Sequence, residues 1–354
     1  MSKVIFHIDM NAFFASVEEI NYPFLIKKPF VIASRSNDKS IISTCSYKAR
    51  SYGIHSAMPL NKAKKLCPNL IVVDGHYDKY VKYSKEIMKI FLRYTDLVLQ
   101  ASIDEAYLDV TNVTNDYFSL AKEIQITILN ELKLPCSVGI GPTLFLAKMA
   151  SDMKKPLGIT IIRKKDVSKK LYNLDVNEFF GIGKKTAVKL NSLGIKTIGD
   201  LVTKKDLIYE HFSKKFTTYV YNCLDGKSSD IVDPKKYDEI SSVSNSRTYN
   251  EAVLDQDDAY NKLEEVANLL YPRIKRYRLL PYTVIVQIRY EGFIMKSKSQ
   301  TLRDPIKSYL ELYNSAKELF DDLWDQKTGI RLLGIAVSNF YEEEYNLFSY
   351  NVKK

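Results

Sequence analysis

Apolar and polar positions alternate along the first half of the chain in a way that predicts mixed strands and helices. The run KVIFHID (3–9) is apolar until its final acid, which is typical of a buried central strand. The segment AFFASVEEI that follows has apolar residues at helical spacing. Further strand-like and helix-like segments alternate to about residue 162, including a predicted hairpin formed by PFVIAS and SIISTCS. This alternation predicts an α/β or α+β domain.

The second half of the chain changes character twice. Residues 164–227 contain short helix-like segments separated by glycines, and DGKSSDIVDPKKYDE is typical of a linker. From residue 240 onwards the apolar spacing predicts strand, helix, two strands, helix and strand. This βαββαβ order is a known compact unit.

Composition and charge narrow the function classes. The 354 residues include 52 Lys and Arg against 42 Asp and Glu, a formal net charge of +10. No apolar run approaches the ~20 residues that cross a bilayer, so we expect no membrane segment. Four scattered cysteines without a CxxC pair favour reduced thiols in a cytoplasmic protein and argue against a zinc site. Residues 164–227 hold thirteen Lys against seven acids, which favours a polyanionic partner.

Three acids interrupt or end apolar strands. Asp9 ends the first strand, and Asp104 with Glu105 lies inside VLQASIDEAYLDV. Buried carboxylates are costly unless they are paired or bound to a cation, so they indicate a site for divalent metal and phosphate. The alternative is that they cap strand ends or pair with lysines. Because adjacent strand residues point to opposite faces, Asp109 is a rival to Asp104 as partner of Glu105.

Four strings carry a resemblance to a known family. HIDMNAFFASVEE, STCSYKARSYGIHSAMP, SIDEAYLDVT and FLAKMASDMKKP follow one another in order. Together they resemble the Y-family translesion DNA polymerases, most closely the bacterial DNA polymerase IV branch, from about residue 3 to 340. The resemblance implies an α+β multidomain, right-hand polymerase with palm, small fingers, a helical thumb bearing a helix-hairpin-helix, and a βαββαβ little finger. The implied boundaries are palm 1–10 and 76–163, fingers 11–75, thumb 164–232, linker 233–239, little finger 240–341 and tail 342–354.

The resemblance also implies the catalytic centre. Asp9, Asp104 and Glu105 match the family's catalytic and metal-binding carboxylates, and the carbonyl of Met10 would complete one metal site. The expected cofactor is Mg²⁺, as two ions, with Mn²⁺ as a substitute. Many relatives have Asp where this chain has Asn11, at a position that is not a metal ligand.

Several positions match the family's nucleotide-binding residues: Phe14, Phe13, Thr44, Tyr47, Arg50 and Lys155. Phe14 matches the ring that excludes a ribose 2′-hydroxyl, with a core residue of the helix as the alternative, whereas for Phe13 the core interpretation is preferred. Tyr47 and Arg50 are helical neighbours that suit a triphosphate, and without the family they would be an ordinary surface pair. Leu157 stands where the family has Asn, and Lys148 is expected to face DNA or solvent.

DNA contacts are expected in two regions. FFGIGKKTAVKLNSLGI resembles a helix-hairpin-helix, in which Gly181, Gly183, Lys184 and Lys185 would approach a DNA phosphate. In the last domain, Lys296 and Lys298 share one strand face, and Arg289 and Arg331 lie in strands. We expect them on a basic open sheet face that follows a duplex; the alternative is a solvated polar face.

The predicted function is template-directed addition of deoxynucleotides to a primer 3′ end by two-metal chemistry, without proofreading. The expected partners are primer–template DNA and deoxynucleoside triphosphates, with the chain acting as a monomer. Glu344–Phe348 (EYNLF) resembles a sliding-clamp peptide in which Glu replaces Gln. The alternatives are a polymerase of the mutasome type that needs accessory subunits, a two-metal nuclease, and a non-catalytic DNA-binding relative.

Overall fold

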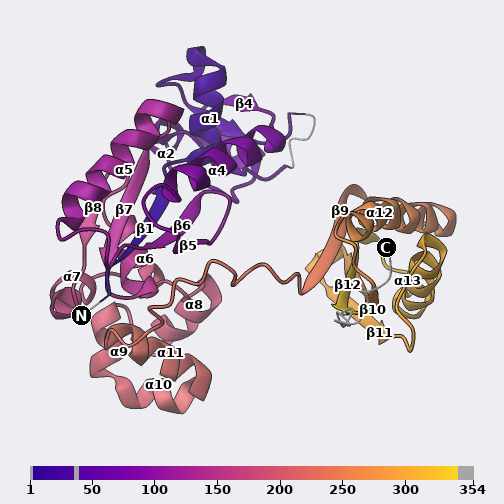
Figure 1. The fold of residues 1–354 in the computed structure, drawn as a ribbon. Helices are drawn as coiled ribbons and strands as arrows, with labels where there is room; N and C mark the ends of the chain where they lie inside the picture. The colour runs from indigo at the N-terminus through magenta and orange to yellow at the C-terminus, as the bar shows by residue number, and fades with distance from the viewer. Residues whose placement is uncertain (1–2, 36–39, 342–354) are drawn as a thin grey trace, which may run out of the picture. The chain divides into compact units, whose positions relative to one another are not determined.

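The chain forms two compact units, Met1–Lys236 and Tyr237–Lys354, which are described separately (Figure 1). The structure is a computed structural model that describes residues 3–35 and 40–341. The clamp-like segment 344–348 therefore lies outside the described residues.

A five-stranded sheet forms the centre of the first unit, in the order β5-β6-β1-β7-β8. Its strands are β1 (Ile5–Met10), β5 (Val98–Gln100), β6 (Glu105–Asp109), β7 (Cys136–Gly141) and β8 (Ile159–Ile161). Strand β1 is antiparallel to both β6 and β7, and β7 is parallel to β8. Every residue of β1 is buried, which confirms the predicted central strand.

Helices cover both faces of this sheet. Phe6, Ile8 and Met10 pack with residues of α4 (Tyr77–Phe91) and α5 (Tyr117–Leu132), and Ile5 packs on the other face with Ala147 of α6 (Leu144–Asp152). By alternation, Asp9 shares the α6 face. A Cβ on Gly139 of β7 would lie 2.0 Å from the Ala147 carbonyl oxygen, so glycine lets the α6 backbone approach the sheet.

A second, three-stranded sheet has the order β3-β2-β4. Its strands are β2 (Phe30–Ile32), β3 (Thr44–Cys45) and β4 (Ile71–Val73), and its helices are α1 (Phe13–Asn21), η1 (Pro23–Leu25), α2 (Tyr47–Arg50) and α3 (Leu60–Leu66). Strands β2 and β3 pair antiparallel, which confirms the predicted hairpin. The short parallel strand β4 was not predicted.

Residues 164–224 form a helical subdomain whose core also includes Phe145, Leu146, Met149 and Ala150 of α6. Its elements are η2 (Lys164–Asp166), α7 (Val167–Leu171), η3 (Val176–Glu178), α8 (Lys184–Ser192), α9 (Ile198–Thr203), α10 (Lys205–His211) and α11 (Lys214–Leu224). The glycine-punctuated helices predicted for this stretch are therefore present.

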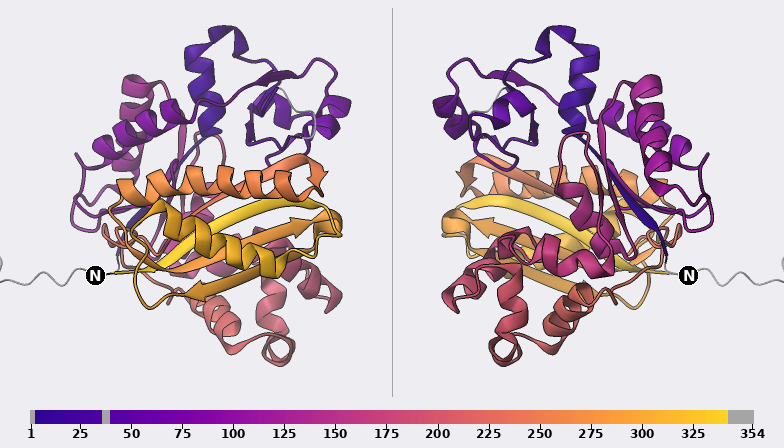
Figure 2. Two further views of the ribbon diagram at one scale, coloured as in Figure 1. Left: turned by 90° about the vertical axis from the view of Figure 1, so that its right-hand side faces the viewer. Right: turned by 90° about the vertical axis from the view of Figure 1, so that its left-hand side faces the viewer.

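The second unit has the predicted βαββαβ order. Its elements are β9 (Ser242–Val253), α12 (Gln256–Arg276), β10 (Pro281–Tyr290), η4 (Glu291–Phe293), β11 (Met295–Thr301), α13 (Tyr309–Leu323) and β12 (Ile330–Phe340). The sheet order is β11-β10-β12-β9, and both long helices lie on one face of it (Figure 2). The other face carries no helix of this unit among the described residues.

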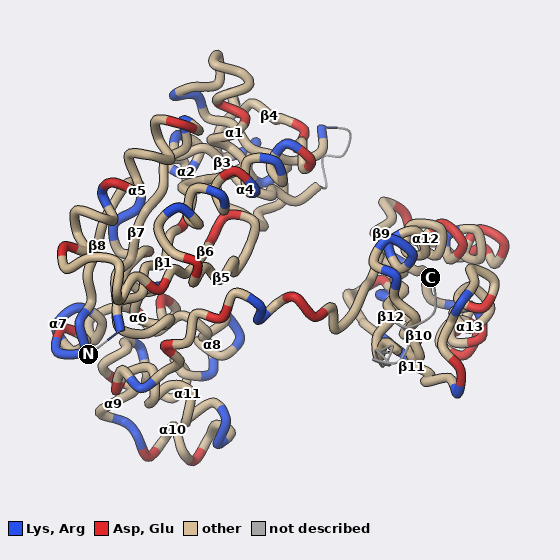
Figure 3. Tube along the Cα trace, viewed as in Figure 1, with Lys and Arg blue, Asp and Glu red and all other residues tan. Residues whose placement is uncertain are grey.

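Lysines and arginines are dense along the helical subdomain, from α7 to α11 (Figure 3). Among residues 3–35 and 40–341 no helix is long and apolar enough to cross a membrane. All four cysteines are buried free thiols, as expected from their scattered positions.

Candidate active site

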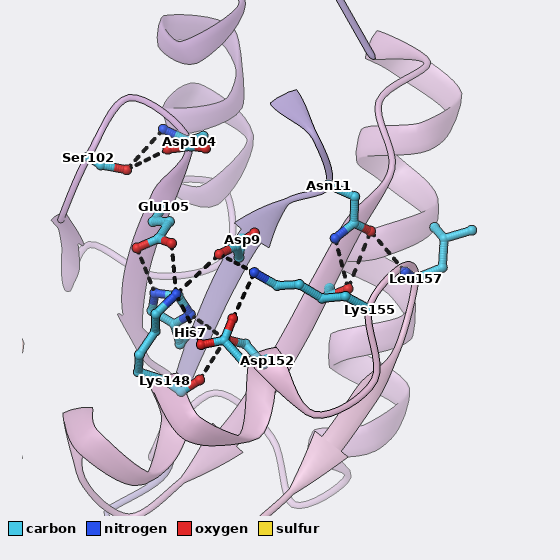
Figure 4. Close-up of polar contacts among 12 residues, drawn as sticks. His7, Asp9, Asn11, Ser102, Asp104, Glu105, Lys148, Asp152, Lys155 and Leu157 are labelled. Atoms are coloured by element: carbon cyan, nitrogen blue, oxygen red, sulfur yellow. Dashed lines mark hydrogen bonds and ion pairs between the residues drawn. The ribbon is translucent and has the colours of Figure 1, made fainter. Parts of the chain in front are cut away.

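The three carboxylates predicted for the site come from one end of the large sheet (Figure 4). Asp9 lies directly opposite Glu105 in the β1–β6 pair. Asp104 precedes β6 in a bend, where its carboxylate accepts a hydrogen bond from Ser102 Oγ at 2.7 Å. Because Asp104 lies outside the regular strand, the alternation of strand faces does not separate it from Glu105.

Asp109, the rival ligand, lies at the opposite end of the sheet. It stands opposite Ile5, and its carboxylate is 3.2 Å from Lys3 Nζ and accepts a hydrogen bond from Thr111. It therefore takes no part in the carboxylate cluster.

Lys148 is the centre of the ion pairs around these acids. Its Nζ lies 2.8 Å from Glu105 Oε1, 3.2 Å from Asp9 Oδ2 and 3.4 Å from Asp152 Oδ2. Only 8% of the residue is exposed. The alternative that Lys148 faces solvent is wrong, because its side chain is directed from α6 at the acids.

Lys155 supplies a second cation to the same cluster. Its Nζ lies 2.6 Å from Asp9 Oδ2 and 2.8 Å from Asp152 Oδ1. Asp152 therefore bridges both lysines, a role that was not predicted although the spacing of Lys148, Asp152 and Lys155 puts them on adjacent helical turns.

The environment shifts the pKa values of these groups in different directions. Burial raises the pKa of Asp104 and, together with the neighbouring Glu105, that of Asp9. For Glu105, hydrogen bonds with His7 and Asp9 outweigh burial and lower the pKa. For Lys148 burial disfavours the charged form, but the surrounding carboxylates outweigh it and raise the pKa. A charged lysine thus stabilises carboxylates that would otherwise repel one another.

His7 lies beneath the cluster and was not predicted as part of it. It is fully buried, its Nδ1 is 2.8 Å from Ser151 Oγ, and its Nε2 is 3.5 Å from Glu105 Oε2. The signal in the sequence was a polar residue two positions before Asp9, on the same face of an apolar strand.

The donor chemistry of the cluster suits a hard divalent cation. Asp9, Asp104 and Glu105 offer only oxygen ligands, which Mg²⁺ and Ca²⁺ prefer. Among the described residues no three His, Cys, Asp or Glu side chains already converge as a metal cluster. Lysine ammonium groups instead compensate Asp9 and Glu105.

A cavity of about 270 Å³ opens beside the acids. It brings together every predicted nucleotide-binding residue with two of the three carboxylates. Its lining includes Asp9, Met10, Phe13, Phe14, Thr44, Tyr47, Arg50, Asp104 and Lys155. Phe13 is also 98% buried in the core of the sheet, which agrees with its preferred interpretation as a core residue.

The short helix α2 presents Tyr47 and Arg50 to this cavity. Ser46 caps it by accepting a hydrogen bond from the Ala49 N–H, and the Arg50 guanidinium lies 5.4 Å from the centre of the Tyr47 ring. Burial raises the pKa of Tyr47, which keeps the phenol protonated as a hydrogen-bond donor.

The glycine-rich turn before α8 has two different glycines. Gly181 has a φ of +97°, and a Cβ there would lie 2.6 Å from Tyr219 Oη. Gly183 is the N-cap of α8, and nothing lies within 4 Å of a Cβ built on it. Lys184 and Lys185 follow as the first residues of α8. The backbone N–H groups at this end are therefore open to an anion.

The lysines of β11 do not lie where they were expected. Lys298 stands opposite Val286 of the buried core, and its Nζ is 2.7 Å from Asp322 of α13. Lys296 shares that face and lies over the Tyr290 ring. The prediction that Lys296 and Lys298 lie on an open sheet face is therefore wrong, because their register places them on the helix-covered side.

The open face is rich in hydroxyl groups. The residues that pair across strands on this face include Ser242, Ser244, Ser246, Thr248, Ser297, Ser299, Thr301 and Ser338. Arg289 belongs to this face, where its guanidinium lies 3.4 Å from Thr248 Oγ1. Arg289 and Arg331 also line one cavity of about 220 Å³ beside Phe293.

Comparison with known proteins identifies the family. The profile of the impB/mucB/samB family matches residues 8–152, its C-terminal domain matches 240–347, and the IMS family HHH motif matches 164–195. DNA polymerase IV of Bacillus velezensis is 42% identical over 97% of this chain and 83% of its own length. DNA polymerase IV of Leptospira interrogans is 39% identical over 98% of this chain and 99% of its own length.

Solved structures agree with these relatives. A Y-family DNA polymerase chimera of Dbh and Dpo4 superposes with a TM-score of 0.84 at 29% identity, over 96% of this chain and 100% of the chimera. The insertion ternary complex of Dbh DNA polymerase gives a TM-score of 0.65 at 28% identity, with the same coverage.

Fold and site together define a DNA-directed DNA polymerase of the translesion class. The chain belongs to the Y family, in its DNA polymerase IV branch, and this membership implies dependence on a divalent metal.

Proposed function

We propose that this polymerase extends a primer 3′ end with two Mg²⁺ ions held by Asp9, Asp104, Glu105 and the carbonyl of Met10. Mn²⁺ would serve as a substitute. The observation that carries the proposal is one cavity lined by Asp9, Asp104, an aromatic pair and four groups suited to phosphate.

The residues of the cluster have separate tasks in this proposal. Divalent ions held by these carboxylates would supply activation of the primer hydroxyl and compensation of the charge on the leaving pyrophosphate. Lys148 would favour the ionised forms of Asp9 and Glu105, since its ammonium contacts both carboxylates. Positioning and charge compensation then supply most of the rate enhancement.

The incoming deoxynucleoside triphosphate would lie in the cavity. Arg50 and Lys155 would compensate its phosphates, with hydroxyl donors from Tyr47 and Thr44. Phe14 would pack against the sugar and exclude a 2′-hydroxyl, while Phe13 forms the wall behind it.

The rest of the chain would hold the primer–template. We assign residues 1–10 and 76–163 to the palm, 11–75 to the fingers, 164–232 to the thumb and 240–341 to the little finger. Gly181, Gly183, Lys184 and Lys185 would bind a phosphate of the duplex, and the hydroxyl-rich face with Arg289 and Arg331 would follow its backbone.

Three further assignments complete the proposal. The chain would act in the cytoplasm, as a monomer, and would bind a sliding clamp through residues 344–348. For the clamp, deletion of residues 343–354 should abolish co-purification with the clamp and leave primer extension without the clamp unchanged. Unaltered co-purification would refute that assignment.

Extension of a labelled primer on undamaged and lesion-bearing templates tests the central proposal. Glu105→Ala and Asp104→Ala should each abolish extension while DNA binding persists. Asp109→Asn is the matched control, because this carboxylate lies at the other end of the sheet. Shortened primers would instead indicate a nuclease. Binding without extension by the unmodified protein would indicate a non-catalytic relative, and extension only with added subunits would indicate a polymerase of the mutasome type.

A further inference from the structure

One buried amide holds the loop that carries Lys155. Asn11 directly follows β1 and is only 1% exposed. Its Oδ1 accepts a hydrogen bond from the backbone N–H of Leu157 at 2.8 Å, and its Nδ2 donates to Ser137 Oγ at 3.0 Å (Figure 4). The amide therefore connects the loop to β7 beneath it.

The same loop is fixed from its other side. The Leu157 carbonyl accepts a hydrogen bond from Gln125 Nε2 at 3.0 Å, and the Gly158 carbonyl accepts one from the Val138 N–H at 2.9 Å. Three backbone polar groups of this loop are thus tied to three different places: Asn11 after β1, Gln125 of α5 and Val138 of β7.

The backbone of this loop needs such support. Leu157 has a φ of +62°, a left-handed conformation that a residue with a branched side chain rarely adopts. About half of its side chain is exposed, so packing does little to hold it there. The hydrogen bonds to Leu157 therefore account for its conformation.

The position of Lys155 depends on this backbone, because only Pro156 separates it from Leu157. The Lys155 ammonium lines the nucleotide cavity and lies 2.6 Å from Asp9. A shift of the loop would move this cation relative to the carboxylates, and misplacement by about 1 Å can weaken a charged contact severely.

We propose that Asn11 is a positioning residue for nucleotide binding: its side-chain amide fixes Leu157 and so directs the Lys155 ammonium into the cavity. The inference rests on the proposed contact between Lys155 and the triphosphate. It also connects two positions that the sequence analysis marked as departures from the family pattern, since Asn11 and Leu157 contact one another directly.

The test is a double-mutant cycle between Asn11→Ala and Lys155→Ala. Affinity for the correct deoxynucleotide is measured on enzyme bound to a dideoxy-terminated primer, so that no chemistry occurs. Steady-state KM and kcat are measured in parallel. Asn11→Ala should weaken nucleotide binding about tenfold, the loss of one buried hydrogen bond, with kcat changed less than about twofold. Asn11→Asp keeps the acceptor for Leu157 N–H and should restore binding.

Non-additivity is the decisive result. If Asn11 acts through Lys155, the double variant should bind nucleotide no more weakly than Lys155→Ala alone. Additive losses, or normal binding by Asn11→Ala, would overturn the inference while leaving the proposed function intact. Normal binding by Lys155→Ala would instead refute the phosphate contact itself.

Folding is checked by the melting temperature of each variant. If Asn11→Ala does not fold, Gln125→Leu takes its place in the cycle, because it removes the donor to the Leu157 carbonyl at similar volume. Gln125→Leu should show the same non-additivity with Lys155→Ala, and additive losses would again overturn the inference.

Discussion

The ring of Phe14 stacks on the ring of Tyr80, with centroids 4.2 Å apart and planes inclined by 11°. Tyr80 is itself fixed, because its hydroxyl donates a 2.6 Å hydrogen bond to the buried carboxylate of Glu18. His76 Nδ1 lies 2.9 Å from the same carboxylate oxygen. The ring proposed to discriminate sugars therefore has a rigid support behind it.

Phe14→Ala should admit ribonucleotides, because it removes the ring that would collide with a 2′-hydroxyl. We expect the ratio of kcat/KM for deoxy- over ribonucleotide to fall at least about 100-fold, with deoxynucleotide incorporation reduced much less. Single-nucleotide incorporation with matched deoxy- and ribonucleotides measures this ratio. An unchanged ratio would remove the role of Phe14 in sugar selection.

Two substitutions at Tyr80 distinguish its support of the Phe14 ring from its contribution to the stability of the folded protein. Tyr80→Ala removes the stacked ring, so sugar discrimination should fall, though by less than in Phe14→Ala. Tyr80→Phe keeps the ring but leaves the buried Glu18 carboxylate with one donor fewer, which should cost about 1–3 kcal/mol of unfolding free energy and preserve discrimination. Incorporation ratios and denaturant unfolding distinguish the two. Loss of discrimination in Tyr80→Phe would show that the hydrogen bond, not the stack, positions Phe14.

Leu157→Asn should stabilise the protein by about 1 kcal/mol, because Asn tolerates the left-handed backbone that Leu adopts here. The Leu side chain is half-exposed, so its removal should cost little. The melting temperature measures the gain. Leu254→Asn is the matched control, since Leu254 is also exposed but is not among the positive-φ residues described. A lower melting temperature for Leu157→Asn would contradict the expected relief of strain.

The acids of the site were predictable because an acid at the end of an apolar strand is conspicuous. Asp9 and Glu105 are cross-strand neighbours, a pairing that follows once both strands are placed in one sheet. The sequence did not predict the bend before β6, which places Asp104 outside the regular strand. It depends on local contacts with Ser102.

Residue spacing alone did not predict where Lys148, Lys296 and Lys298 point. Alternation correctly put Lys296 and Lys298 on one face of their strand, but which face was decided by the packing of α13, whose Asp322 pairs with Lys298. Similarly, helical spacing could not show that Lys148 faces the acids. That orientation follows from the close approach of α6 to Gly139, which requires the tertiary fold.

Metal binding should depend on pH through Asp9. Burial and the hydrogen bond with Glu105 raise the pKa of Asp9 to about 7, so a proton competes with the metal near neutral pH. Affinity for Mn²⁺ should therefore fall as the pH drops below about 7, by at most about tenfold per pH unit. Because the Lys148 charge lowers the Asp9 pKa, Lys148→Met should move the midpoint of this fall to higher pH. Electron paramagnetic resonance of Mn²⁺ with DNA-free protein measures both curves, and coincident midpoints would contradict the assignment.

The two glycines of the helix-hairpin-helix should respond differently to alanine. Gly181→Ala combines a φ of +97° with a Cβ only 2.6 Å from Tyr219 Oη, so the melting temperature should fall. Gly183→Ala meets no neighbour within 4 Å and should fold normally, yet its methyl group would occupy the space where a phosphate approaches the N-terminus of α8. Its affinity for primer–template should therefore fall at every salt concentration.

Lys184→Ala and Lys185→Ala should instead each reduce the slope of log K against log salt by about one. Glycine carries no charge, so weakened DNA binding by Gly183→Ala with an unchanged slope of log K against log salt would identify a backbone contact. Normal DNA binding by Gly183→Ala would exclude this turn from the DNA interface.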